Sequence, residues 1–296
     1  MAKQPRILVG EVAAITGAAR GIGKATAQAF AREGMKVAIG DVDVALAEQT
    51  AAEIGPNAAA FGLDVTSRDS FAAFIDATER RFGPLDVLVN NAGIMPLGRF
   101  LDEDDTTAER MVDINLHGVI LGMKIALPRM MARNRGHVVN IASQAGKYGV
   151  PGGATYSATK HAVIGLTEAV RGELRVEGSV VRLSYVMPYV VNTELGTGTQ
   201  RARGYRNLEP GEVADAIVDA LQRDLVDVWL PRSSRTTHRV TTLLPRRASE
   251  ALARVIKADR VLMGADKQAR AAYELRAAGS DERQLESGDE PRRLAS

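Results

Sequence analysis

A tyrosine and a lysine lie four residues apart in the segment YSATK, at Tyr156 and Lys160, and Ser143 lies thirteen residues before the tyrosine. On a helix, residues i and i+4 share one face, so the phenol and the ammonium group would point to the same side. The spacing allows two interpretations. One is a core tyrosine beside a solvated lysine, and the other is an acid–base pair in which the lysine makes the phenol easier to ionise.

Simple magnitudes show why the second interpretation needs a lysine. A free phenol has a pKa of about 10, and bringing it to ~7 takes about 4 kcal/mol at 1.36 kcal/mol per pKa unit. A unit charge about 4 Å away contributes roughly 4 kcal/mol at an effective dielectric constant of 20, whereas a neutral hydrogen bond contributes only about 1 kcal/mol. We therefore expect Lys160 to lower the pKa of Tyr156, and Ser143 to serve for positioning.

A glycine-rich segment, TGAARGIG at residues 16–23, could bind a phosphate. Gly17 permits a tight turn after a strand, Gly21 allows close backbone approach, and Gly23 allows the next helix to pack tightly on the sheet. The free N–H groups at that helix start attract an anion. The alternative is merely a tight turn between strand and helix.

An acidic residue, Asp41, ends the second expected strand 24 residues after Gly17. An acid at that distance can accept the ribose hydroxyls of an adenosine and would repel a 2′-phosphate, so the sequence favours NAD over NADP. Arg20 could counter this preference by pairing with a 2′-phosphate. The alternative for Asp41 is a solvated residue at a helix start.

Two further segments stand at expected strand ends. Asp64 and Val65 could meet an adenine edge, or Asp64 could cap the helix that begins near Ser67. In NNAG, residues 90–93, the asparagine side chains could tie neighbouring loops together, and the small residues would keep the floor beneath a cofactor thin. By itself NNAG could also be a turn.

The elements that must position these residues alternate along the chain. Apolar, β-branched runs predict strands, and helical patterns lie between them, which together predict a doubly wound, mainly parallel α/β sheet. The expected strands are Val12–Thr16, Lys36–Asp41, Ala58–Asp64, Leu85–Asn90, Gly136–Ala142, Val180–Val186 and Asp227–Leu230, and the expected helices cover residues 22–33, 43–54, 67–82, 104–132, 154–176 and 210–223.

Composition excludes several classes of protein. The chain has 296 residues, 45% of them hydrophobic, which suits one large α/β domain or two small ones. A net charge of +2 gives no general attraction to nucleic acid, and the lack of cysteine excludes disulfides and permits a reducing cytosol. The four histidines form no metal-binding pair, so we expect no metal. No segment approaches the ~20 apolar residues that span a bilayer, and we expect a cytoplasmic protein.

Taken together, TGAARGIG, NNAG, Asn115, Ser143 and YSATK resemble the short-chain dehydrogenase/reductase family in its shorter, classical form, over about residues 8–230. The resemblance implies a Rossmann-like fold and an NAD(P)-dependent oxidoreductase that interconverts an alcohol and its ketone or aldehyde. It implies that Tyr156 is the acid/base, Lys160 lowers its pKa and holds the nicotinamide ribose, Ser143 orients the substrate oxygen, and Asn115 supports a water next to Lys160. The implied cofactor-binding residues are Gly17, Arg20, Gly21, Ile22, Gly23, Asp41, Asp64, Val65, Asn91, Ala92, Gly93, Tyr156, Lys160, Pro188, Val190 and Thr193.

One segment departs from the family pattern. In MPYVVNTEL, residues 187–195, Tyr189 stands where glycine is common, and its ring either narrows the pocket or turns outward. The residues expected to face a substrate are mostly apolar, which predicts an apolar alcohol or ketone, with lipid-like steroids or retinoids as candidates. They are Met95, Pro96, Leu97, Tyr148, Val150, Tyr189 and the glycine-rich 194–207 segment, which is either a mobile lid or a disordered surface loop.

After Pro231 the pattern changes, which predicts three parts: a dinucleotide-binding and catalytic domain over 1–230, a basic helical extension over 231–278, and a disordered tail over 279–296. Residues 231–260 carry eight Arg/Lys and two acids. The amphipathic part, 231–263, could lie on an anionic membrane surface, or it could pack on its own domain with a solvated basic face.

Other functions remain open at this point. An epimerase or lyase on the same scaffold usually carries a longer substrate domain, and a dinucleotide-sensing protein has no need of a tuned phenol. By analogy with the family, the helices over 104–132 and 154–176 are expected to form homodimer or homotetramer faces.

Overall fold

The computed structural model describes residues 4–278 and contains one seven-stranded sheet in which every strand is parallel to its neighbours. The strand order is β3-β2-β1-β4-β5-β6-β7, so the chain winds outward in both directions from β1. The predicted doubly wound α/β fold is confirmed. The strands are β1 Val12–Thr16, β2 Lys36–Asp41, β3 Ala58–Gly62, β4 Val87–Asn90, β5 His137–Ile141, β6 Arg182–Pro188 and β7 Asp227–Leu230.

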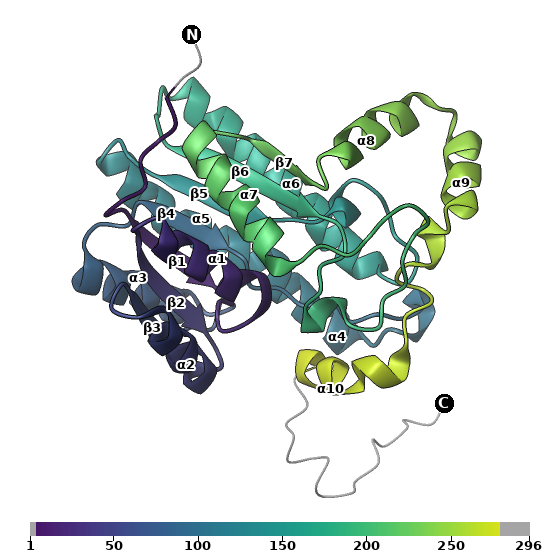
Figure 1. Ribbon diagram of the computed structural model, residues 1–296, viewed down its shortest axis with the longest axis horizontal. Helices are drawn as coiled ribbons and strands as arrows, with labels where there is room; N and C mark the ends of the chain where they lie inside the picture. Colours follow the sequence, from purple (N-terminus) through teal and green to yellow (C-terminus); the bar gives the residue numbers. More distant parts are fainter. Residues whose placement is uncertain (1–3, 279–296) are drawn as a thin grey trace, which may run out of the picture.

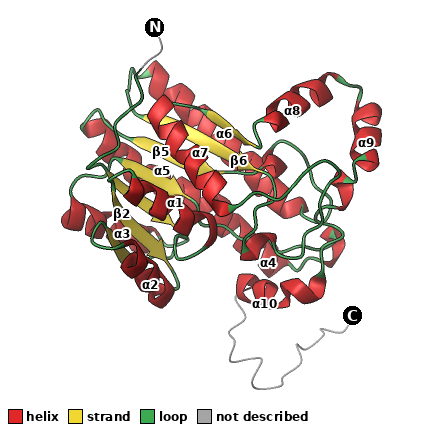
Figure 2. Ribbon diagram, viewed as in Figure 1, coloured by secondary structure: helices red, strands yellow, loops and turns green. Residues whose placement is uncertain are grey.

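Helices cover both faces of the sheet (Figures 1 and 2). One apolar cluster joins α1 and α7 to the sheet, and a second joins α3, α5 and α6 to its other face. The helices of this body are α1 Gly21–Arg32, α2 Val44–Ile54, α3 Arg68–Phe82, α4 Asp105–Val112, α5 Gly118–Ala132, α6 Ala154–Val176 and α7 Pro210–Arg223.

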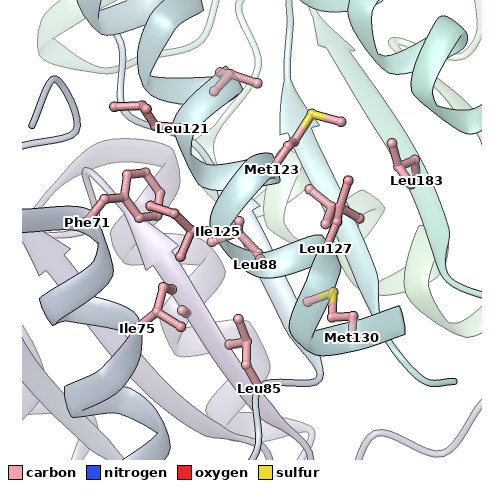
Figure 3. Packing of buried hydrophobic residues seen from close by; sticks show 14 of the residues in the cluster. Phe71, Ile75, Leu85, Leu88, Leu121, Met123, Ile125, Leu127, Met130 and Leu183 are labelled. Atoms are coloured by element: carbon pink, nitrogen blue, oxygen red, sulfur yellow. The ribbon is translucent and has the colours of Figure 1, made fainter. Parts of the chain in front are cut away.

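The packing of α5 shows why the strands are apolar along their whole length. Leu121, Ile125 and Met130 on α5 lie over Leu85 and Leu88, with side chains of α3 beside them (Figure 3). Because helices cover both faces, strands such as β1 are buried at every position, and no polar–apolar alternation is needed.

Several element boundaries differ from those predicted. β3 ends at Gly62 rather than Asp64, because the Asp64 carboxylate accepts the Thr66 N–H and turns the chain. β4 begins at Val87 rather than Leu85, and β5 is one residue shorter at each end than expected. β6 runs over Arg182–Pro188 rather than Val180–Val186, since its ladder to β7 continues to Pro188.

The predicted helix over 104–132 is continuous, but it is not one regular α-helix. Residues Asp113–His117, between α4 and α5, are π-helical. Such bulges are frequent at functional sites, and this one carries Asn115. By length and composition Asp105–Ala132 is also the one helix in the described residues that could cross a membrane, but 56% of its apolar window is buried inside the fold.

The segment after β7 forms three helices, α8 Ser233–Leu243, α9 Arg246–Val255 and α10 Lys267–Ala278. α8 and α9 extend away from the sheet as an arm, and the chain then returns so that α10 lies near α4 (Figure 1). The predicted tail, 279–296, lies outside the described residues.

Candidate active site

A cavity of about 2260 Å³ lies at the edge where β1, β2, β4, β5 and β6 end. Carboxyl ends of parallel strands meet at one edge, which is where open α/β sheets bind ligands. Of the predicted cofactor-binding residues, the cavity is lined by Gly17, Arg20, Gly21, Ile22, Asp41, Asp64, Val65, Asn91, Ala92, Gly93, Tyr156, Lys160, Pro188, Val190 and Thr193. Gly23 lies behind this lining.

The glycine loop is shaped as a cradle. Gly17 and Gly21 have φ values of +62° and +56°, which favour glycine. A Cβ at Gly23 would come within 2.4 Å of the Gly17 carbonyl oxygen. The loop therefore turns tightly into α1, whose first residues, Gly21 and Ile22, line the cavity, and this arrangement fits the pyrophosphate of a dinucleotide.

Asn91 joins the glycine loop to the end of β4. Its Nδ2 donates to the carbonyl oxygens of Thr16 at 2.9 Å and Gly17 at 2.8 Å. In return, Thr16 Oγ1 accepts the backbone N–H groups of Asn91 and Ala92. These bonds fix the floor of the cavity beneath the glycine loop.

Asp41 is 9% exposed and lies at the end of β2, beside the glycine loop. One carboxylate oxygen accepts the Ala19 N–H at 3.0 Å and the other accepts the Asp43 N–H at 3.1 Å. Each oxygen has a further lone pair for a ribose hydroxyl. The second predicted acid, Asp64, accepts from the Thr66 N–H and hydroxyl and does not cap α3, because Ser67 does so.

Arg20 is held by carboxylates rather than left free in the cavity. Its guanidinium pairs with Asp43, and with Glu194 at 3.2 Å. A 2′-phosphate would have to compete with these two acids for the guanidinium, which opposes the idea that Arg20 reverses the preference set by Asp41.

Ser143, Tyr156 and Lys160 meet in the middle of the cavity. Ser143 follows β5 and forms a side-chain hydrogen bond with the hydroxyl of Tyr156, and Tyr156 and Lys160 lie on α6. Lys160 Nζ donates to the Ile141 carbonyl oxygen at 2.9 Å and lies 5.7 Å from the centroid of the Tyr156 ring.

The expected lowering of the Tyr156 pKa is not found in the chain alone. Burial raises the pKa of Tyr156 to about 12, and the hydrogen bond with Ser143 opposes this only partly. Burial also lowers the pKa of Lys160 to about 8. The attraction expected between the Lys160 ammonium and the Tyr156 phenolate is opposed by the loss of water around both groups. This loss disfavours the charged form of each group. The phenol is therefore the protonated, acid form here.

Asn115 lies in the π-helical segment, fully buried behind the cavity wall. Its amide accepts the Ile94 N–H and donates to the Ile94 carbonyl oxygen, both at 2.8 Å, and its Nδ2 lies 3.3 Å from the Thr159 hydroxyl. Asn115 thus joins the loop after β4 to α6 at Thr159, the residue directly before Lys160.

Of the predicted substrate residues, Met95, Tyr148, Val150 and Tyr189 line the same cavity, as do parts of the 194–207 segment, whereas Pro96 and Leu97 do not. Tyr189 does not turn outward: its hydroxyl accepts the Ala202 N–H at 3.2 Å and its ring lies 5.0 Å from that of Tyr205. Tyr148 packs edge-on against His238 of α8. A third apolar cluster surrounds the Tyr156 ring and includes Met95, Met111, Ala145, Ala202, Val261 and Leu262.

The C-terminal segment brings residues to this cavity that the sequence did not predict. Tyr273 of α10 lines the cavity, and Arg270 is buried and donates to the carbonyl oxygen of Met95, which also lines it. The apolar residues of the 231–263 segment indicated that it packs on another surface, but an amphipathic pattern does not reveal which surface that is. In residues 4–278, no group of three or more acids or histidines could hold a metal ion.

The fold and this site define a dinucleotide-binding oxidoreductase with a Ser–Tyr–Lys arrangement. Residues 11–204 match the family model for short chain dehydrogenases. The chain belongs to the short-chain dehydrogenase/reductase family.

Named relatives and solved structures agree with this assignment. The chain is 40% identical over 207 residues to a sorbitol dehydrogenase of Cereibacter sphaeroides, covering 69% of this chain and 80% of that protein. It is 38% identical over 216 residues to a 3-alpha-(or 20-beta)-hydroxysteroid dehydrogenase of Mycobacterium bovis, covering 71% and 82%. A short chain dehydrogenase/reductase from Burkholderia phymatum in complex with NAD superposes with a TM-score of 0.73 at 28% identity, covering 80% of this chain and 94% of that one.

Proposed function

We propose that this protein is an NAD-dependent dehydrogenase that interconverts an apolar secondary alcohol and its ketone. The observation that carries the proposal is the position of the Tyr156 hydroxyl. Tyr156 lies on α6, and its hydroxyl forms a hydrogen bond with Ser143, which follows β5. The hydroxyl lies between the glycine loop and the apolar cluster that surrounds the Tyr156 ring.

The side chains then have distinct tasks. Bound NAD supplies the hydride acceptor. Ser143 orients the substrate oxygen, and the Tyr156 oxygen takes the hydroxyl proton during oxidation or returns it to the carbonyl oxygen during reduction. With a pKa of about 8, Lys160 is mostly protonated at pH 7 and stabilises the phenolate as it forms. Because burial raises the pKa of Tyr156 to about 12, the chain by itself holds Tyr156 ready as a proton donor.

The cofactor is NAD rather than NADP on two grounds. Asp41 presents a buried carboxylate where a 2′-phosphate would lie, and Arg20 is bound to Asp43 and Glu194. A 3-ketoacyl-(acyl-carrier-protein) reductase from Brucella melitensis, 30% identical with a TM-score of 0.69, was solved with NADH.

The substrate class follows from the lining around Tyr156. Relatives carry names for polyols, such as sorbitol and galactitol, and for hydroxysteroids. A polyol needs many hydrogen-bond partners, whereas the cluster around Tyr156 is formed by Met, Ala, Val and Leu side chains with a few tyrosine hydroxyls. This composition favours a substrate with an apolar carbon framework and few oxygen atoms.

The proposal is tested by incubating the protein and NAD with a panel of apolar alcohols and a panel of polyols. NADH formation is followed by absorbance. We expect turnover with hydroxysteroids or long-chain secondary alcohols, and little with sorbitol or galactitol. Tyr156→Phe should lower kcat by about 10²- to 10⁴-fold and leave NADH binding intact. Cofactor binding without turnover of any alcohol or ketone would instead indicate a dinucleotide sensor, and a redox-neutral product would indicate an epimerase or lyase.

We further propose a cytoplasmic protein that assembles into homodimers or homotetramers through α4, α5 and α6. Light scattering of the purified chain tests the assembly, and a monomer at micromolar concentration would contradict it. The α8–α9 arm, which combines exposed apolar and basic side chains, is proposed to touch an anionic membrane surface.

A further inference from the structure

We propose that the C-terminal segment, residues 256–278, closes the substrate side of the catalytic site, and that Tyr273 is a specificity-determining residue in contact with the substrate. This deepens the dehydrogenase function proposed above and rests on it. The segment lies outside residues 11–204 that match the family model.

Tyr273 is placed at the site by the loop that follows β4. Its hydroxyl oxygen accepts the Met95 backbone N–H at 2.7 Å, and the residue lines the same cavity as Tyr156. Burial raises the pKa of Tyr273, so it keeps its own proton. In the described part of the chain this O–H donates to no partner, and it is therefore available to an oxygen of a bound ligand.

Arg270 holds α10 in this position. It is 1% exposed, and its guanidinium donates to the carbonyl oxygens of Leu195 at 2.9 Å and Thr197 at 2.8 Å. A third bond reaches the Met95 carbonyl oxygen at 2.7 Å, and Glu274 balances the charge. One buried side chain thus joins α10 to two substrate-facing segments, with a planar fork of donors that lysine lacks.

Backbone hydrogen bonds extend this connection along the segment. The Gln200 N–H donates to the Val261 carbonyl oxygen at 2.9 Å, and the Arg203 N–H donates to that of Ile256 at 2.8 Å. The Asp266 N–H donates to the Gly198 carbonyl oxygen at 2.8 Å. The 194–207 segment is therefore clamped by residues 256–266 rather than left as a free lid or a disordered loop.

The body of the protein is shaped to receive the segment. Gly152 has a φ of +85°, and a Cβ there would come within 2.7 Å of the backbone of Met263. Next to it, Leu262 is buried in the cluster around the Tyr156 ring. At Gly152 and Gly153, the lack of a side chain therefore leaves room for Leu262 and Met263 of the extension.

Leu262 and Tyr273 therefore bound the substrate side of the cavity, opposite its nicotinamide side. A substrate whose reacting carbon lies beside Tyr156 must fit between the nicotinamide side of the cavity and the face made by Leu262 and Tyr273. The size of the side chain at position 273 therefore limits the size of the substrate group next to the reacting carbon.

The test compares Tyr273→Ala and Tyr273→Phe in the full chain, using kcat/KM for a small and a bulky secondary alcohol that the wild type oxidises. We expect Tyr273→Ala to shift the bulky-to-small ratio by about 10-fold or more toward the bulky alcohol, and Tyr273→Phe to keep the wild-type ratio within a few-fold. NADH affinity, measured by fluorescence titration, should stay unchanged in both variants.

Arg270→Ala tests the positioning role. It should lower kcat/KM for both alcohols and shift their ratio, with unchanged NADH affinity, while Lys267→Ala on the exposed face of α10 should match the wild type. An unchanged ratio in Tyr273→Ala and Arg270→Ala would overturn the inference even if the wild type is an active dehydrogenase. Absence of wild-type turnover with every alcohol would contradict the proposed function instead.

Discussion

At the scale of single residues, burial decides the resting state of the acid–base pair. Tyr156 and Lys160 share a face of α6, as their spacing predicted, but water is excluded from both. The sequence could reveal the spacing because helix geometry is local. It could not reveal the loss of solvation, which depends on Met95, Val261 and Leu262 arriving from distant parts of the chain.

Lys160→Met should stabilise the protein while removing its activity. Burial lowers the pKa of Lys160 from 10.5 to about 8, so below pH 8 the native state bears the full cost of a buried ammonium. At 1.36 kcal/mol per unit, less about 1 kcal/mol for the hydrogen bond to Ile141, the free energy of unfolding should rise by about 2 kcal/mol at pH 7.

The sign of the pH dependence follows from the same shift. Between about pH 8 and 10.5 the unfolded chain binds more protons at this site than the native one, so wild-type stability from this group increases with pH. In urea titrations, the difference in the free energy of unfolding between Lys160→Met and the wild type should therefore decrease across that pH range. Lys267→Met, at an exposed position, serves as a control. A destabilised Lys160→Met protein at pH 7 would contradict this account.

Asp41→Asn should weaken the discrimination between coenzymes. It removes the negative charge that a 2′-phosphate would meet, yet keeps an acceptor for the Ala19 N–H. We expect the NAD-to-NADP ratio of kcat/KM to fall by about 10-fold, since one charge contact is worth between ~1 and ~4 kcal/mol at intermediate dielectric constants. Asp43→Asn would remove one of the two carboxylate partners of Arg20 and leave the Asp41 carboxylate in place, and a larger effect of this change would assign the coenzyme preference to Arg20.

At the scale of elements, the α8–α9 arm combines exposed apolar side chains with basic ones. Leu243 is 87% exposed and Val255 is 65% exposed. The same arm carries exposed arginines at 239, 246, 247 and 254. Helices with this composition bind anionic membrane surfaces, and apolar substrates partition there, which is why we propose the contact.

Liposome co-sedimentation tests whether the α8–α9 arm binds an anionic membrane surface. Wild-type binding to vesicles that contain anionic lipid should weaken as salt increases, and Leu243→Ser with Val255→Ser should weaken it further at low salt. Neutral vesicles should bind poorly. Binding that is insensitive to both salt and these two changes would rule out the arm as the contact.

The extension also illustrates what local patterns can and cannot predict. A helical extension was expected over 231–278, and α8, α9 and α10 lie within it, but residues 256–266 form turns and a short 3-10 helix instead of an α-helix. Their docking depends on Arg270 and on the bare backbone at Gly152, which are individually unremarkable in sequence. The separation of a 1–230 domain from a 231–278 extension stays a prediction, although the two make the catalytic cavity together.

At the scale of the whole molecule, the sheet could be predicted because central strands such as β1 and β4 are buried at every position and are therefore mostly apolar, although the edge strand β3 is only half-buried. Strand ends were less predictable, since they depend on pairing partners, as Pro188 opposite Leu230 shows for β6. The cofactor half of the cavity follows from motifs at strand ends. The substrate half depends on contacts between residues near 95, 150, 200 and 270, which no local pattern encodes.

The docking of residues 256–278 over the substrate side of the cavity has a consequence for biosynthesis. About a hundred residues separate Lys160 from Tyr273, which at 5–20 residues per second corresponds to roughly 5–20 s of translation. During that interval the nascent chain already carries the glycine cradle and the Ser–Tyr–Lys residues but has an unfinished pocket. Ribosome-stalled chains ending before residue 256 should therefore bind coenzyme yet discriminate poorly among alcohols, so that selectivity is the last property the polypeptide acquires.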